Sequence, residues 1–393
     1  MNHVPLKSLC VIKHGGTPSK ANPVFWRGEI PWVSPKDMKT TVIFGAADQI
    51  SREAVENSAT SVVPEKSILV VVRSGVLVHS LPVAQVARPV AFNQDIKALI
   101  PDHAAVDPDY LYWFVRAQEN LVLTRGVKKG ATVHSVQSGF LENLLVPMPA
   151  RSEQRRIVDL LSRAEGIVRL RREAEKKAAE LIPAIFLDMF GDPATNPKEW
   201  PVTRLDDLCD LVRGSSPRPQ GDSRFFGGPV PRLMIADITR DGVYVKPAID
   251  SLTVEGAKKS RPMHKGEVVM AVSGAVGLPA ILAIDACIHD GFVGFRSLDD
   301  AVSPEFFYNF LAAFRRHSIG QAVGATFQNL KTDQIRDWMV PIPPPDLQSR
   351  FQKTANDLRG LETQQSAATD KAQATFDALL TQAFSPKPCA TFA

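Results

Sequence analysis

Cysteine is scarce in this sequence, and its placement excludes two kinds of site. The 393 residues include only four cysteines, Cys10, Cys209, Cys287 and Cys389. They lie far apart, whereas zinc sites and disulfide scaffolds bring cysteines together at short, recurring spacings. We therefore expect reduced, buried thiols and no metal site built from cysteine.

Long apolar runs and a strong net charge are also lacking. No run approaches the roughly 18 to 20 residues that a helix needs to cross a bilayer. The first residues show no basic segment followed by an apolar one, so no secretory leader is expected. Forty-six Lys and Arg against 42 Asp and Glu give a charge of +4, which permits a nucleic acid partner without requiring one. We expect a cytoplasmic protein with no membrane partner.

The motifs of common enzymes are missing or incomplete. The sequence contains no HExxH, no GxSxG and no His or Cys pair at metal-ligand spacing. Residues 22–25 lack the second proline of the amino-methyltransferase loop, and residues 15–20 lack the spacing of a phosphate-binding loop. We expect no catalytic residue in this chain, and no metal or cofactor bound to it.

The sequence does contain a repeat of its own first half. Hydrophobic residues make up 44% and charged residues 22% of the chain, which is typical of a folded protein, and the length suits two or three domains. Matching segments follow one another in the same order: 6–10 with 205–209, 15–18 with 214–217, 25–28 with 225–228, 106–110 with 302–306, 130–132 with 324–326, and 146–149 with 340–343. Ordered self-similarity of this extent indicates an internal duplication.

Each half divides into a mixed segment and a helical one. We assign residues 1–150 and 193–345 to two mixed domains, 151–192 and 346–385 to two long helices, and 386–393 to a tail. Apolar runs at 67–72, 267–272 and 280–284 predict strands. Residues 108–119 and 304–316 predict helices, with Asp107 or Ser303 as the N-cap and proline at the first helical position. The predicted fold class is α+β, with a duplicated mixed domain.

Apolar stripes predict that the two long helices pair with each other. Apolar residues recur at steps of three and four from Ile157 to Met189 and from Phe351 to Ala383. The positions assigned to these spacer and partner helices are Ile157, Leu160, Ile167, Leu181, Phe351, Leu358, Leu361 and Leu379. Neither helix is apolar all round, so we expect an antiparallel coiled coil. It would give the repeat a pseudo-two-fold arrangement that suits DNA with two half-sites.

The ends of these helices carry local signals. Ser152 is the expected N-cap of the first helix and Gly191 its stop. Pro183 should kink this helix near its end, because proline removes an amide donor. Asp346 or Ser349 is the expected N-cap of the second helix.

Cationic side chains in the loops are the candidates for contacting DNA. They are Lys36, Lys39, Arg73, Arg125, Lys128, Lys129 and His134 in the first half, and Arg213, Arg218, Arg224, Arg232, Arg240, Lys258, Lys259 and Arg261 in the second. Lys and Arg bind phosphates, and Arg reads guanine edges; for any one of them a solvated surface position is the alternative. Matching positions differ between the halves, as with Trp32 and Arg232, or His134 and Gln328. One scaffold with two sets of loop residues is expected of two readers of different sequences.

Together these motifs make the chain similar to the specificity subunit of type I restriction-modification enzymes. The resemblance is carried by residues 15–18 (Gly-Gly-Thr-Pro), 30–34 with Asp37, 93–95 (Asn-Gln-Asp), 107–111, and 146–149 leading through 153–157 into the first long helix. The second half repeats the pattern at 214–217, 302–306 and 341–343, followed by Gln348. It departs from the pattern at 288–290, which read Ile-His-Asp, and at 344–348, where Pro-Pro-Asp-Leu-Gln enters the second long helix.

The resemblance implies a function and a set of partners. It implies two target recognition domains, each binding one half of a bipartite site in double-stranded DNA, and a coiled-coil spacer that binds two methyltransferase (M) subunits. Motor-nuclease, or restriction (R), subunits would join through them, and S-adenosylmethionine, ATP and magnesium would belong to these partners. Two alternatives stay open: a coiled-coil adaptor whose lobes bind protein, and a specificity protein of a type II-like modification or restriction enzyme.

Overall fold

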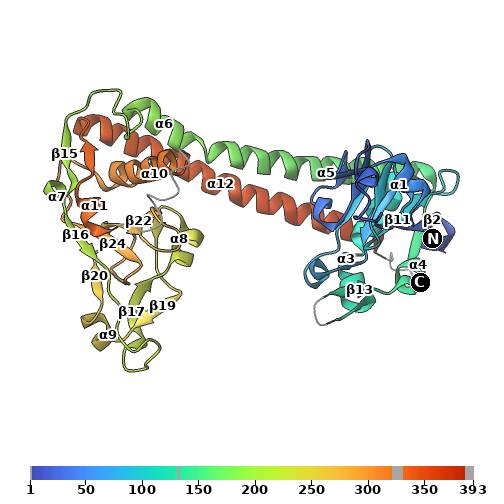
Figure 1. Ribbon diagram of the computed structural model, residues 1–393, viewed down its shortest axis with the longest axis horizontal. Helices are drawn as coiled ribbons and strands as arrows, with labels where there is room; N and C mark the ends of the chain where they lie inside the picture. The colour runs from blue at the N-terminus through green and yellow to red at the C-terminus, as the bar shows by residue number, and fades with distance from the viewer. Residues whose placement is uncertain (1, 131–132, 321–330, 386–393) are drawn as a thin grey trace, which may run out of the picture. The chain divides into compact units, whose positions relative to one another are not determined.

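The computed structural model of the chain divides into two compact units (Figure 1). It describes residues 2–130, 133–320 and 331–385, and for 317–320 the backbone alone. Unit 1 comprises Met1–Arg172 with Ala368–Ala393, and unit 2 comprises Glu173–Ala367. Residues 131–132 and 324–326, Gln328, Cys389 and the tail 386–393, all used in the sequence predictions, lie outside the described residues.

Unit 1 contains two larger sheets, a short two-stranded one and a small three-stranded one. The five-stranded sheet has the order β2-β11-β7-β9-β4, formed by Cys10–His14, Ile96–Pro101, Ile68–Val71, Val83–Val86 and Val42–Ile43. The four-stranded sheet has the order β5-β3-β10-β6, formed by Asp48–Ile50, Ile30–Val33, Val90–Phe92 and Val62–Val63. β1 (Asn2–Pro5) pairs with β14 (Leu145–Met148).

Side chains of the central strand β7 belong alternately to two separate cores of unit 1. Leu69 and Val71 of β7 join the core between the two larger sheets. Ile68 and Val70 point to the opposite face, because successive side chains of a strand alternate. There they join α2 (Pro108–Ala117) and the long helices in the second core.

Unit 2 repeats the two larger sheets and the two-stranded sheet strand for strand. Its sheets have the orders β16-β24-β21-β22-β18 and β19-β17-β23-β20, with β15 paired to β25. In the order just given, the strands are Asp210–Arg213, Phe292–Arg296, Val268–Ala271, Pro279–Leu282 and Tyr244–Val245, then Asp250–Leu252, Phe226–Leu233, Ala286–Ile288 and Arg261–Met263, and Val202–Arg204 with Met339–Pro341. The parallel pair β3·β10 recurs as β17·β23, and β4·β9 as β18·β22. The internal duplication, the α+β class and the predicted strands are confirmed.

The matched helices α2 and α10 (Pro304–Gly320) begin with the predicted caps. The Asp107 carboxylate accepts hydrogen bonds from two backbone amides of α2, and the Ser303 hydroxyl accepts one from α10. A buried glutamine secures each start. Gln154 accepts from the Asp107 amide and donates to the Pro149 carbonyl, and Gln348 makes the equivalent bonds with Ser303 and Pro343. This explains why both glutamines recur in the repeat.

The long helices run antiparallel, as predicted. They are α5 (Arg151–Ala178), followed by α6 (Leu181–Phe190), and α12 (Pro345–Phe384). In unit 1, Arg172 donates to the Gln373 side chain. In unit 2, Figure 1 shows α6 beside the first part of α12, and the ring centroid of Phe351 lies 5.5 Å from that of Phe186.

The register predicted for the paired faces is partly wrong. Ile157 and Phe351 are buried, and Leu358 and Leu379 pack against the cores as expected. Leu160, Ile167, Leu181 and Leu361 are instead exposed, and the neighbouring Leu161, Val168 and Ile182 are buried. The error has a simple cause: apolar residues occupy adjacent positions such as 160 and 161, so periodicity alone allows two stripes.

The predicted helix starts also need correction. α5 begins at Arg151 and α12 at Pro345, so Ser152, Asp346 and Ser349 lie within the first turns and are not N-caps. The structure shows a full break at 179–180, between α5 and α6, instead of a kink at Pro183. Proline then lies in the first turn of α6, where a missing amide donor costs little. Gly191 ends α6 with a positive φ of 81°, as predicted.

The cysteine prediction is confirmed for the three described cysteines. Cys10, Cys209 and Cys287 are reduced and buried. Burial raises the pKa of the Cys10 and Cys209 thiols to about 12, which keeps them protonated and unreactive near neutral pH. No described helix combines the length and the apolar character needed to span a membrane.

Candidate nucleic-acid interface

In each unit two loops cross at close range near the candidate residues. In unit 1 this loop crossing is made by the segments that follow β2 and β10, and in unit 2 by those that follow β16 and β23. A Cβ atom on Gly15 would lie 2.1 Å from the Asn93 carbonyl oxygen, and one on Gly214 would lie 2.0 Å from that of His289. Glycine is therefore required at both positions. The crossing shows that Asn93 matches His289 and Gln94 matches Asp290, one residue away from the sequence alignment of Asn-Gln-Asp with 288–290.

The same crossing presents different polar groups in the two units. Thr17 Oγ1 donates to Gln94 Oε1 at 2.5 Å in unit 1. In unit 2, Ser216 Oγ donates to Asp290 Oδ1 at 2.6 Å, which lowers the pKa of Asp290. A neutral amide thus stands where the other copy carries a carboxylate.

A small three-stranded sheet in unit 1 gathers five of the predicted cations. Its order is β12-β13-β8, formed by Val127–Lys128, His134–Val136 and Arg73–Ser74. Lys128 lies opposite Ser135, which lies opposite Arg73, so both cations project from one face. Arg125 directly precedes this sheet, Lys129 follows β12, and His134 begins β13. Arg73 also forms an ion pair with Asp95 at 2.8 Å, which ties the sheet to the loop crossing.

Unit 1 also has a pocket of about 680 Å³. Its lining comprises Lys20, Pro23, Trp26, Arg27, Trp32, Ser34, Lys36 and Asp48. The Trp32 indole donates to the Gly16 carbonyl at 2.9 Å, so the pocket adjoins the crossing. Lys36 pairs with Asp48 at 2.7 Å, and this hydrogen bond raises the pKa of Lys36. Lys39 is exposed after the short helix η3 (Pro35–Asp37) and does not line the pocket.

Arg232 does not fit its predicted role as an exposed DNA contact. Its side chain is only 9% exposed and pairs with Asp250 at 2.5 Å. It also donates to Ser216 Oγ at 3.0 Å and lies over the Phe226 ring. The prediction failed because the alternation of β17 turns this residue inward, next to a partner on β19. Its charge still matters locally, since burial and Arg232 together lower the pKa of His289.

Three other predicted cations of unit 2 surround the loop crossing. Arg213 donates to the Asp290 carbonyl at 2.9 Å, and Arg218 lies 3.7 Å from its carboxylate. Arg261 donates to the Arg213 carbonyl at 3.1 Å. These guanidinium groups therefore converge on the turn that matches the Asn93–Asp95 turn of unit 1.

The remaining predicted cations of unit 2 form two separate groups. Arg224 and Lys259 both lie against the Phe225 ring, Arg224 is also paired with Asp222, and Lys258 is exposed nearby at the end of α9 (Val254–Lys258). Arg240 lies apart, on α8 (Ile235–Asp241), where it pairs with Asp237 and Asp241. The Arg224 and Arg240 side chains themselves stay 69% and 44% exposed, so a phosphate can reach their guanidinium groups.

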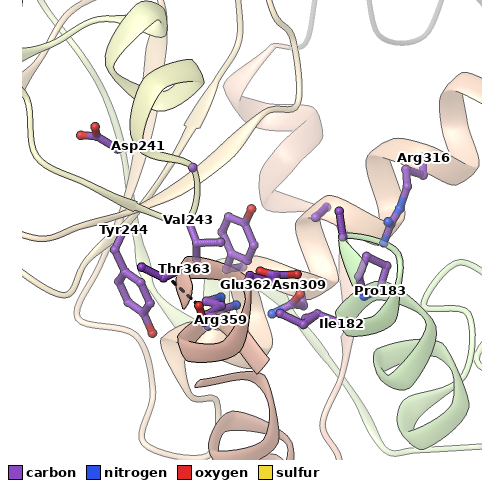
Figure 2. Close-up of a pocket in the computed structure, with 14 residues that line it drawn as sticks. Ile182, Pro183, Asp241, Val243, Tyr244, Asn309, Arg316, Arg359, Glu362 and Thr363 are labelled. Carbon is purple, nitrogen blue, oxygen red and sulfur yellow. Dashed lines mark hydrogen bonds between the residues drawn. The ribbon is translucent and has the colours of Figure 1, made fainter. Parts of the chain in front are cut away.

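A second pocket, in unit 2 and of about 450 Å³, lies between α6, α10 and α12 (Figure 2). Beside it Glu305, which is 1% exposed, accepts a hydrogen bond from Tyr244 at 2.5 Å and pairs with Arg359. Figure 2 shows Arg359 and Glu362 of α12 facing Asn309 of α10. Because Glu305 and Arg359 compensate each other's charge here, we assign this pocket a structural role.

The sequence analysis missed the residues that shape the unit 1 pocket. Trp26, Lys20 and Arg27 line it but were not among the candidates. The signal was available, because Trp26 and Trp32 are two of only five tryptophans and stand near the cations at 20, 27 and 36. Across the described residues, no group of three or more His, Cys, Asp and Glu side chains is placed to hold a metal ion.

Comparison with known proteins gives one family. The model for the type I restriction modification DNA specificity domain matches residues 1–180 and 197–366. The chain is 39% identical over 168 residues to the type I restriction enzyme EcoR124I/EcoR124II specificity subunit of Escherichia coli, a match covering 42% of this chain and 41% of that protein. It is 24% identical over 383 residues to the type I restriction enzyme MjaIX specificity subunit of Methanocaldococcus jannaschii, covering 90% and 85%.

A solved structure has the same fold. It comes from work described as the structural basis of complex assembly and conformational transition of the type I R-M system. The match has a TM-score of 0.68 at 18% sequence identity and covers 98% of this chain and 97% of that chain. Two repeated α+β domains joined by long helices are therefore an arrangement already found in nature.

Proposed function

Because the chain belongs to the family of type I restriction modification DNA specificity proteins, we propose that it recognises a bipartite DNA site and assembles the enzyme subunits that act there. The chain is the non-catalytic specificity component of such a system. Each unit binds one half-site. S-adenosylmethionine, ATP and magnesium are used by the methyltransferase and restriction subunits.

The observation that carries this proposal is one scaffold with two sets of polar groups. Unit 1 presents Gln94 and the cations of the β12-β13-β8 sheet at its loop crossing. Unit 2 presents Asp290 surrounded by arginines at the equivalent crossing. Donor and acceptor patterns decide which base edges a protein reads. Two readers that share a scaffold and differ in these polar groups suit two different half-sites.

Selection from random duplexes tests the proposal. The chain, copurified with its methyltransferase subunits, should enrich one sequence made of two specific parts and an unspecified gap. Arg73→Gln should weaken one half-site only, and Arg261→Gln the other, each by about 1–3 kcal/mol if the arginine contacts a base. Equal effects of either variant on both half-sites would contradict the assignment of one half-site to each unit. Enrichment of no sequence would contradict DNA recognition itself and favour the adaptor alternative.

An exposed apolar face on α5 is proposed to bind a methyltransferase subunit. Leu160, Ile167 and Leu170 are 42%, 53% and 58% exposed. Their spacing places them on one side of the helix. Soluble proteins rarely leave such a row uncovered unless a partner binds it.

Charge on this face should release the methyltransferase subunit. Leu160→Glu with Ile167→Glu adds two desolvated carboxylates to the interface, and copurification with the coexpressed methyltransferase subunit should fall at least tenfold. Circular dichroism should stay unchanged, because neither residue belongs to a core. Ser162→Glu, on another exposed face of α5, is the matched control. Undiminished copurification of the double variant would place the contact elsewhere.

A further inference from the structure

The pocket beside Trp26 occupies a place that a side chain fills in unit 2. Trp32 lies opposite Asp48 across β3 and β5, and Arg232 lies opposite Asp250 across β17 and β19. Trp32 and Arg232 are therefore equivalent, and Trp26 matches Phe226 in the repeat. The Arg232 guanidinium lies 5.3 Å from the centroid of the Phe226 ring. One unit has an open aromatic pocket where the other has a buried cation.

The unit 1 pocket combines an apolar wall with a cationic rim. The Trp26 and Trp32 rings meet edge to face with centroids 5.1 Å apart. Both indole N–H groups are used internally, by the Ser19 and Gly16 carbonyls. A ligand in the pocket therefore contacts carbon atoms of the two rings and finds no free indole N–H to bond.

The rim of this pocket favours an anionic partner. Lys20, Arg27 and Lys36 line it against a single carboxylate, that of Asp48. Its volume of about 680 Å³ falls in the ~300–1,000 Å³ range of ligand sites. The pocket therefore suits a ligand with a neutral apolar group inside and negative groups at the rim. A nucleotide fits this description when its base edge enters the pocket and its phosphates stay outside.

We propose that this pocket receives the methyl-bearing edge of a thymine in the half-site bound by unit 1. The inference rests on the proposed function. Apolar side chains recognise the thymine methyl group in the major groove, and Lys and Arg hold the flanking phosphates. Unit 2 reads its half-site without this contact, because Arg232 fills the equivalent place.

Replacing single methyl groups of the DNA tests the proposal on the unaltered protein. Each thymine of the selected site is exchanged in turn for deoxyuridine, which lacks only the methyl group. Exchange of one thymine, in one half-site, should weaken binding of the duplex about fourfold. This factor corresponds to ~0.8 kcal/mol for one buried methyl-sized group. The affinity is measured for the chain in complex with its methyltransferase subunits.

A double-mutant cycle ties this thymine to the pocket. Trp26→Ala should reduce the fourfold difference between thymine and deoxyuridine duplexes, because it removes one of the two rings that form the apolar wall. Val24→Ala, on the same short helix η2 (Pro23–Trp26) but outside the pocket lining, should keep the fourfold difference. Trp26→Phe keeps an apolar wall and should keep part of it.

The outcomes separate this inference from the proposed function. If every thymine tolerates exchange, or if the fourfold difference persists in Trp26→Ala, the thymine pocket is wrong while bipartite recognition stands. If the unaltered complex selects no sequence, the proposed function itself is wrong.

Discussion

A variant with one extra heptad in both α5 and α12 is expected to recognise the same two half-sites across a longer gap. The dividing points between the units, 172/173 and 367/368, lie inside these two helices. Seven residues inserted at each point lengthen both connections by about 10 Å at ~1.5 Å per residue. At ~3.4 Å per base pair this corresponds to about three base pairs. Modification of the original site should fall to background.

A heptad is the right unit because buried positions recur at this spacing. Leu161 and Val168 are buried seven residues apart on α5, as are Thr369 and Phe376 on α12. An insertion of seven therefore preserves which side of each helix is buried. Methylation mapping of the variant gives the new gap.

One control variant and one possible outcome test the role of the helices as a ruler. Insertion into α5 alone shifts its seam against that of α12 and should destabilise the protein without producing a new site. If the double insertion modified both half-sites across an unchanged gap, the helices would not act as a ruler, and they would serve for binding the enzyme subunits alone.

The fold was predictable from sequence wherever the signal was local or repeated. Asp107 and Ser303 cap their helices because an N-cap needs only a side chain and the amides next to it. The strands at 67–72 and 267–272 were found because buried β-branched runs carry their own signal. The duplication then supported the division into two mixed domains and two long helices, since each half supported the reading of the other.

What failed depended on contacts that one segment does not encode. Leu160 and Leu161 are equally apolar, and only packing of α5 within unit 1 decides that Leu161 is buried. Arg232 looked like any loop cation, but its strand partner Asp250 holds it inside. The Trp26 pocket was missed although tryptophans at 26 and 32 indicate an aromatic site, because only the fold shows that they line one pocket with the cations at 20, 27 and 36.

Loss of Arg359 should destabilise unit 2 far more than loss of an ordinary surface charge. Its partner Glu305 is 1% exposed, and the arginine itself is 18% exposed. Arg359→Met leaves a buried carboxylate with hydrogen bonds from Tyr244 and Asn309 but no cation. Breaking a buried pair in this way costs about 3–5 kcal/mol. Urea denaturation followed by circular dichroism measures the change in the free energy of unfolding.

Variants of Glu305 and of an exposed ion pair test whether the buried charge causes the loss of stability. Glu305→Gln in the Arg359→Met background removes the uncompensated charge and should recover much of the lost stability, because an amide still bonds to Tyr244 and Asn309. Arg163→Met breaks the exposed pair with Asp159, whose side chains are 76% and 59% exposed, and should change stability little. If Arg163→Met and Arg359→Met lowered the stability equally, burial of Glu305 would not set the energetic role of this network. If the double variant were no more stable than Arg359→Met alone, the loss would come from the contact of the Arg359 guanidinium with the Tyr244 ring, 5.5 Å from its centroid.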